Sequence, residues 1–301
     1  MSGPSRFPPT GIALLCMLLS TLLIASMHGS VRGLGGELHP FVIVFFRNLF
    51  GLIAVAPLIL RAGVSSLKTD RPRLYIVRSA IGIVAMVLWF YALSLVPLTN
   101  ATALSFSTTM FATLSAWLFL GEKMRGRRWA AIAVGLLGVL VVLRPDTTGF
   151  NRYALLILCS TMAWGVSISI AKSLSRTDSV TSIVGWMSIS LTILSLPLAL
   201  TVWQTPTGSQ FLWLALIGAL ATAGHLLMTT ALKMADTGVV MSVDFARLVW
   251  TALIGAWFFG EILDVWTAVG AALIFAAGLY IIFRESKLKI PSRAADKPPV
   301  G

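Results

Sequence analysis

Asp244 and Arg247 are the two residues whose types and spacing most directly predict chemistry. They stand in VVMSVDFARLVWTALIGAWF, residues 239–258, a stretch that is otherwise almost wholly apolar. Placing a charge at the centre of a lone membrane helix costs about 2.5 to 3.5 kcal/mol. Side chains three residues apart on a helix are neighbours, so these two charges can neutralise each other. The pair is either a structural ion pair or a polar anchor for a solute or proton, and the rule that intramembrane charges face a cavity favours the second interpretation.

Hydroxyl and imidazole side chains recur at helical spacing in other apolar stretches. Ser105, Thr108 and Thr109 share one polar stripe, and His225 lies on another. Small hydroxyl residues also pack membrane helices against each other, so packing and cavity lining stay equally open for the stripe. For His225, a structural hydrogen bond and a role as ligand or proton carrier are equally open.

Four aromatic side chains lie beside these polar stripes: Trp89, Phe106, Trp164 and Phe245. Planar ligands stack on such rings. Packing or a place at the membrane interface remains the simpler interpretation for each ring taken alone. A cavity that combines rings, one basic group and many hydroxyls would suit a flat, polar heterocycle of low charge.

Enzyme and cofactor signatures are missing from the sequence, which contains no HExxH, GxSxG, P-loop or dinucleotide-binding glycine pattern. We therefore predict no catalytic residues, no metal site and no cofactor. Without an ATP-binding motif, concentrative work must come from a gradient. A net charge of +12 would indicate nucleic acid in a soluble protein, but the placement of the basic residues indicates a membrane instead.

The elements that position these residues are predicted from composition. Of the 301 residues, 57% are hydrophobic and 11% charged, whereas soluble chains have about 25% charged residues. A helix needs about 20 apolar residues to cross a bilayer. Ten such stretches with short gaps predict an all-α integral membrane protein of ten transmembrane helices: residues 11–29, 38–60, 72–93, 98–120, 129–143, 153–171, 180–203, 211–232, 239–259 and 265–283.

The lysines and arginines predict the orientation of these spans. With the N-terminus placed in the cytoplasm, seventeen of the 23 fall in cytoplasmic segments, while Arg32, Arg144 and Arg152 fall on the opposite side. This is the positive-inside pattern. Because the number of spans is even, both termini are expected in the cytoplasm.

Depth within the spans gives expectations for three more polar residues. His28 lies near the end of its span and is expected at the membrane interface. Arg78 lies close enough to a span end to reach the interface, an interpretation that stays open beside burial. Arg47 lies near the middle of its span, where we expect backbone carbonyls to hold it, although Asp244 is one of very few acids available as a partner.

The two halves of the chain repeat each other. ALSLVPLTNATALSFSTTMFATLSAWLFLGE, from Ala92, aligns at one constant offset with ALKMADTGVVMSVDFARLVWTALIGAWFFGE, from Ala231. Each half has five helices, an odd number, so the second half is inverted relative to the first, as in secondary transporters with substrate sites between the halves. Glu122 and Glu261, which end the two segments, then lie on opposite membrane faces. We expect them to bond loop amides or basic residues at helix ends, not to act together.

The repeated segments also resemble a known family. PLTNATALSFSTTMFATLSAWLFLGEKMRGRRWAAIAVGLLGVLVVLRP and DFARLVWTALIGAWFFGEILDVWTAVGAALIFAAGLYIIFRE look like the two halves of an EamA-type protein of the drug/metabolite transporter superfamily. The resemblance covers residues 11–285. It implies a bacterial inner-membrane carrier whose cavity is lined mainly by the first, third and fourth helices of each half. The DFARLVW segment is similar to branches that include riboflavin and S-adenosylmethionine carriers.

We therefore expect a secondary transporter that moves a small organic metabolite across the inner membrane by alternating access. Uptake of a planar vitamin such as riboflavin is the first hypothesis, and an S-adenosylmethionine carrier or an amino acid or drug exporter is the alternative. A non-transporting membrane scaffold or an intramembrane enzyme is the alternative from a different class.

The predicted organisation is a cytoplasmic segment (1–10), two five-helix repeats (11–145 and 152–285) and a basic cytoplasmic tail (286–301). The expected partners are a small-molecule substrate and the lipid bilayer, with no nucleic acid. Small residues of the fifth and tenth spans permit a homodimer: Gly135, Gly138, Gly270 and Gly278.

Overall fold

The computed structural model describes residues 9–63, 68–121, 124, 126–144, 151–174, 177–178, 180–235, 237–262 and 264–289, and all regular structure in them is helical. The all-helical architecture predicted from the sequence is confirmed. The helices are α1 (Pro9–Leu34), α2 (Pro40–Ala62), α3 (Pro72–Leu93), α4 (Leu98–Ser105), α5 (Thr108–Leu120), α6 (Gly126–Leu143), α7 (Ala154–Leu174), α8 (Val180–Thr201), α9 (Gly208–Met234), α10 (Thr237–Ser242), the 3-10 turn η2 (Val243–Phe245), α11 (Ala246–Phe259) and α12 (Val265–Lys289).

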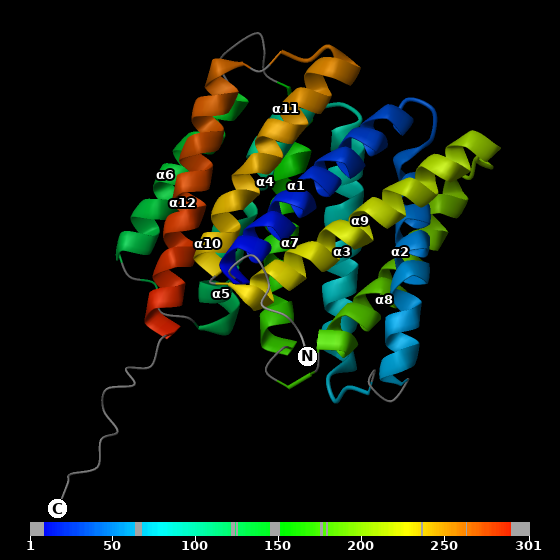
Figure 1. Cartoon of the computed structure of the whole chain (residues 1–301), viewed down its shortest axis with the longest axis horizontal. Coiled ribbons are helices and arrows are strands. Elements are labelled where there is room, and N and C mark those ends of the chain that lie inside the picture. Colours follow the sequence, from blue (N-terminus) through cyan, green and yellow to red (C-terminus); the bar gives the residue numbers. More distant parts are fainter. Residues whose placement is uncertain are drawn as a thin grey trace, which may run out of the picture.

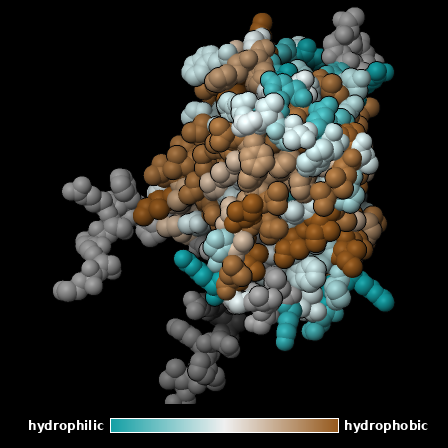
Figure 2. Space-filling view, turned by 90° about the vertical axis from the view of Figure 1, so that its right-hand side faces the viewer, coloured by the Kyte–Doolittle hydropathy of each residue, from teal (hydrophilic) through white to brown (hydrophobic). Residues whose placement is uncertain are grey.

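The helices form a bundle with a membrane protein's surface. Within the described residues, eight helical stretches are long and apolar enough to cross a bilayer, and Gly185–Thr201 is apolar but shorter. Brown, hydrophobic side chains gather around the middle of the molecule in Figure 2, and teal, hydrophilic ones lie at its upper and lower ends. This is the distribution that a hydrocarbon layer between two aqueous faces requires. Residues 1–8 and 290–301, most of the predicted terminal segments, lie outside the described residues.

Local sequence signals set several helix ends. Proline stands in the first turn of α2 and α3, where its missing N–H costs nothing. A capping box of Thr207 and Gln210 begins α9. Gly121 and Gly260 end α5 and α11 at φ angles of 66° and 64°, a left-handed conformation that only glycine adopts without strain. These two glycines are equivalent in the repeat, so both halves stop the same helix in the same way.

The structure corrects the prediction that residues 98–120 and 239–259 are continuous helices. The first is broken after Ser105, where a tight turn separates α4 from α5, and the second is broken by η2 between α10 and α11. At the first break, serine and threonine hydroxyls bond to backbone carbonyls one turn earlier. Ser107 donates to the carbonyl of Leu104 at 2.7 Å, and Thr108 donates to that of Ser105 at 2.7 Å. Such bonds satisfy polar backbone that would otherwise be costly inside a bilayer.

Helices of the two halves interleave in a symmetric way. The pairs α1 with α9 and α3 with α7 pack extensively, and each pair joins the first helix of one half to the third helix of the other. Figure 1 shows α1 and α9 side by side in the middle of the bundle, and α6 beside α12 at one edge. Equivalent helices therefore make equivalent contacts across the two halves, as an inverted repeat requires.

The glycines of α6 and α12 pack these two helices against each other. A Cβ added at Gly138 would lie 2.7 Å from the carbonyl oxygen of Gly270, and one at Gly270 would lie 2.7 Å from that of Gly138. Gly135 faces Met110 and Ala277, also within the chain. Small residues thus allow close helix approach inside one molecule. The glycines that permitted a homodimer in the sequence analysis therefore pack against other helices of the same chain.

Candidate functional site

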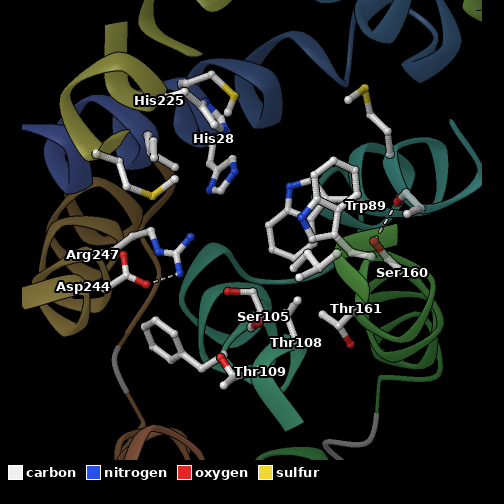
Figure 3. Close-up of a pocket in the computed structure, with 18 of the residues that line it drawn as sticks. His28, Trp89, Ser105, Thr108, Thr109, Ser160, Thr161, His225, Asp244 and Arg247 are labelled. Carbon is white, nitrogen blue, oxygen red and sulfur yellow. Dashed lines mark hydrogen bonds and ion pairs between the residues drawn. The ribbon is translucent and has the colours of Figure 1, made fainter. Parts of the chain in front are cut away.

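A cavity of about 320 Å³ lies where the two broken helices meet the rest of the bundle. Its wall comes from both halves: α1, α2, α3, α4 and α5 of the first, and α7, α9, α10, η2 and α11 of the second. This volume is at the lower end of the range of small-molecule sites. Figure 3 shows Asp244 and Arg247 on one side of the cavity and Trp89, Ser160 and Thr161 on the opposite side.

Nine of the ten residues predicted for the site line this cavity. They are Asp244, Arg247, His225, Ser105, Thr108, Thr109, Trp89, Phe106 and Trp164. Phe245 does not line it; its ring packs 6.1 Å from that of Phe106 and 4.7 Å from that of Phe275, centroid to centroid. Phe106 and Phe245 are equivalent residues of the repeat, so their stacked rings join the two helix breaks to each other.

The helix breaks place equivalent positions of the two halves on the cavity wall. Ser105 ends α4 and Thr108 begins α5, and their equivalents are Asp244 in η2 and Arg247 in the first turn of α11. The same backbone device therefore presents hydroxyls from the first half and charges from the second. Discontinuous helices with a polar site at the break are typical of secondary transporters.

Asp244 and Arg247 form an ion pair at the cavity wall. The Arg247 Nη2 atom donates to Asp244 Oδ2 at 2.8 Å, and the Asp244 residue is only 8% exposed. The guanidinium carbon also lies 5.1 Å from the centroid of the Phe106 ring, a cation–π contact. Phe106 belongs to the first half, so this contact joins the charged pair to the opposite helix break.

Several hydroxyl groups on the cavity wall donate their hydrogen to backbone carbonyls. Ser105 donates to the carbonyl of Thr102 at 2.7 Å, and Ser160 donates to that of Ala85 at 2.7 Å. A hydroxyl has two lone pairs besides its proton. Ser105, Thr108 and Ser160 therefore present acceptor oxygens to a solute whose N–H or O–H groups face them.

Two histidines line the same cavity. His225 Nδ1 lies 2.7 Å from the carbonyl oxygen of Ala221, and a carbonyl only accepts, so Nδ1 carries the hydrogen. His28 was expected at the membrane interface, and that expectation is wrong. It is 6% exposed, its ring lies 5.1 Å from that of Trp89 at 57°, and its Nδ1 has no partner among the described residues. Figure 3 shows its ring directed into the cavity.

Two arginines within the predicted spans differ in their surroundings. Arg47 of α2 lines the cavity and donates to the side chain of Asn48 at 3.0 Å, not to the backbone carbonyls expected from the sequence. Arg78 of α3 donates to Ile183 O at 3.5 Å and Met187 Sδ at 3.3 Å on α8. Arg78 thus bridges two helices away from the cavity wall, while Arg47 belongs to it.

Glu261 ties three helices together at the end of the bundle where α1 and α11 end and α4 begins, hereafter the Glu261 end. Its Oε1 lies 2.7 Å from Arg32 Nη2 of α1, and its Oε2 accepts from the Leu98 N–H of α4 at 2.8 Å. Gly255 leaves room for the carboxylate, since a Cβ there would lie 2.8 Å from Oε2. Glu261 thus bonds an amide and a basic residue, as predicted, while Glu122 lies outside the described residues.

Comparison with known proteins identifies the family of the chain. The sequence profile of the EamA-like transporter family matches residues 11–144 and again residues 151–284. The chain belongs to the EamA-like transporter family. It is therefore a multi-pass membrane transporter, and each half is one copy of the family's repeat.

Individual relatives carry two different substrate names. The S-adenosylmethionine uptake transporter of Rickettsia felis is 34% identical over 273 residues, which cover 90% of this chain and 92% of the relative. The riboflavin transporter of Rhizobium johnstonii is 32% identical over 244 residues, 81% of each chain. A crystal structure of a protein 20% identical, covering 92% of this chain and 98% of its own, superposes with a TM-score of 0.59, which supports the fold alone.

Proposed function

We propose that the protein is an uptake carrier for S-adenosylmethionine that works by alternating access across the bacterial inner membrane. The observation that carries this proposal is the Asp244–Arg247 pair on a cavity wall that also presents Trp89 and Trp164. S-adenosylmethionine joins a zwitterionic amino acid and a sulfonium to a planar adenine. A carboxylate beside a guanidinium, opposite aromatic rings, provides groups for both parts.

The recognition would divide between the two sides of the cavity. The carboxylate of Asp244 is an acceptor for the ammonium group or a counter-charge for the sulfonium, and the tryptophan rings offer surfaces for adenine. The acceptor hydroxyls of Ser105 and Thr108 suit the ribose O–H groups. The relatives named as S-adenosylmethionine transporters also cover more of this chain than those named for riboflavin.

Riboflavin, the first hypothesis from the sequence, is kept as the second candidate. The aromatic rings and hydroxyls of the cavity suit an isoalloxazine ring and a ribityl chain, and riboflavin transporters are among the relatives. Riboflavin is uncharged, however, and leaves the Asp244–Arg247 pair without a role in binding. The site itself does not distinguish uptake from export, and the proposed direction is supported by the relatives that are named uptake transporters. A non-transporting scaffold or an intramembrane enzyme finds no comparable support in the site.

The proposed orientation has both termini in the cytoplasm, supported by the placement of seventeen of 23 basic residues on that side. Arg32 and Glu261 then lie at the periplasmic face. Inhibition of net uptake by dissipating the proton gradient would indicate proton coupling, and equal exchange without a gradient would indicate an exchanger.

The test is thermal stabilisation of the purified protein by S-adenosylmethionine, riboflavin, amino acids and nucleosides. A ligand at one hundred times its dissociation constant adds about 2.7 kcal/mol to stability. We expect S-adenosylmethionine to stabilise the wild type and Trp164→Ala to lose the effect. The matched control is Trp117→Ala, because Trp117 is 40% exposed and packs on Trp129 away from the cavity. Stabilisation by riboflavin alone would move the assignment to the second candidate.

Uptake of labelled S-adenosylmethionine into cells that produce the protein tests the direction. Accumulation above that of cells with the empty vector supports uptake. Faster loss of preloaded substrate with no accumulation would identify an exporter and refute the proposed direction.

A further inference from the structure

The cavity wall carries two guanidinium groups and one carboxylate. Arg47 and Arg247 both line it, and Asp244 is the one acidic residue among the described residues of the lining. Asp244 is already engaged by Arg247 at 2.8 Å. The wall therefore has one positive charge more than its own acids neutralise.

Arg47 makes little use of its hydrogen-bonding capacity. Its Nη1 donates to Asn48 Oδ1 at 3.0 Å, and its Nε is buried and has no partner among the described residues. Asn48 is a neutral partner and itself donates to the sulfur of Met86 at 3.4 Å. A guanidinium has five N–H donors in a planar fork, so most of the donors of Arg47 remain available to a ligand.

A charge in this setting requires a partner. Ionisable residues within membrane helices pair with each other or with backbone carbonyls, or they line a path for a solute. Apart from the side-chain amide of Asn48, the described residues offer Arg47 neither a carboxylate nor a backbone carbonyl at hydrogen-bond distance. A planar fork that faces a cavity matches the geometry of a carboxylate, which it can bind through two parallel hydrogen bonds.

We propose that Arg47 is a carboxylate-binding subsite, so that the transported solute carries a carboxylate which neutralises this arginine in the bound state. His28 adds a second polar group on the wall, since its Nδ1 is buried with no partner in the described part of the chain and its ring points into the cavity. The inference deepens the proposed function: it assigns the carboxylate of S-adenosylmethionine to Arg47 and leaves Asp244 for the cationic groups. Riboflavin has no carboxylate and does not fit this subsite.

The test compares ligand pairs that differ in the carboxyl group. The pairs are S-adenosylmethionine with its decarboxylated form, and L-methionine with L-methioninamide, measured by calorimetry on the purified protein. We expect the wild type to bind the carboxylate member at least tenfold more tightly. In Arg47→Gln this ratio should fall to near one, and Arg47→Lys, which keeps the charge without the fork, should give an intermediate ratio. Arg78→Gln is the control, since Arg78 bonds to α8 away from the cavity wall, and should keep the wild-type ratio.

The two proposals fail in different ways. If both adenosyl compounds bind the wild type equally well, the proposed function survives and the carboxylate subsite is refuted. If neither adenosyl compound binds but methionine is preferred over its amide through Arg47, the cargo assignment fails and the subsite stands. If no pair shows an Arg47-dependent preference, the subsite is refuted.

Thermal stability without ligand provides an independent check. If the counter-charge of Arg47 comes only from a bound solute, the arginine destabilises the ligand-free protein. Arg47→Gln should then melt at the wild-type temperature or above it. An arginine that holds the fold together would lower the melting temperature when replaced. A clear decrease in Arg47→Gln, larger than that in Arg78→Gln, would overturn the assignment.

Discussion

Removing the charge of Glu261 should loosen the Glu261 end of the bundle. Glu261→Gln keeps the shape of the side chain but removes its charge, and with it the ion pair to Arg32 at 2.7 Å and the charge assistance of the hydrogen bond from the Leu98 N–H at 2.8 Å. Hydrogen bonds to charged groups contribute about 1.5 to 3 kcal/mol and neutral ones about 0.5 to 1.5. The loss is then about 1 kcal/mol for the hydrogen bond and about 1 kcal/mol for the ion pair. The total of about 2 kcal/mol is about 30-fold in the ratio of the form that keeps these contacts to the form that has lost them.

Cysteine accessibility measures this ratio. In a protein with Cys16 and Cys159 replaced by serine, Thr108→Cys places a thiol on the cavity wall. A membrane-impermeant maleimide applied from the Glu261 face should label it up to about 30-fold faster when Glu261→Gln is added. Glu37→Gln is the control, because Glu37 is exposed and its carboxylate accepts from the neutral side chain of Gln210. An unchanged labelling rate in a folded Glu261→Gln protein would refute the role assigned to this carboxylate.

Three further changes test other contacts. Asp244→Asn removes the counter-charge of Arg247 and should lower the free energy of unfolding by about 1 to 3 kcal/mol. A normal folded yield with an altered pH dependence of transport would instead assign Asp244 to coupling. Gly138→Ala puts a Cβ 2.7 Å from a carbonyl of α12 and should cost about 1 to 3 kcal/mol in thermal unfolding, whereas Gly33→Ala, with nothing within 4 Å, should not. A hydrogen bond from Thr69 at 2.6 Å is the main cause that lowers the pKa of Asp178. Its stabilisation is therefore complete above its unfolded pKa, near 4, and lost as pH falls through the lower folded value. As pH is lowered below about 4, the melting temperature of Asp178→Asn should therefore fall less than that of the wild type. An identical pH profile in the variant would contradict the assignment.

The fold and most of the cavity wall were predictable because both depend on local periodicity. Span length and charge placement indicate membrane helices. The helical spacing of Ser105 with Thr108, and of Asp244 with Arg247, indicates one polar face on each of the two segments. The helix breaks were not predictable, since neither contains a glycine or proline. At the first break the hydroxyls of Ser107 and Thr108 bond to backbone carbonyls, and serine and threonine also occur in unbroken membrane helices. His28 was misplaced because α1 continues to Leu34, five residues past the predicted end of the span, which moves it into the bundle.

The position of Arg47 on the cavity wall could not be predicted from the sequence, for a different reason. Its depth within α2 was clear, but depth does not say which side of a helix faces a cavity. That α2 contributes to the wall follows from its packing against α8, α9 and α3, contacts between residues far apart in the sequence. The polar residues of α2 are Arg47 and its neighbour Asn48 in the middle and Arg61 in the last turn. They give no periodic polar stripe, so no local pattern marks the face of Arg47.

The two helix breaks also explain how one fold can hold an asymmetric site. Duplication gave both halves the same interrupted helix, and the stacked rings of Phe106 and Phe245 join the two breaks at equivalent positions. The side chains beside the breaks then diverged, to Ser105 in one half and Asp244 in the other. If the halves exchange conformations during transport, each takes the backbone arrangement of its equivalent. Because the stacked rings of Phe106 and Phe245 join the two breaks, we expect the breaks to stay together during this exchange, so that Asp244 remains beside the solute while the ends of the bundle open and close.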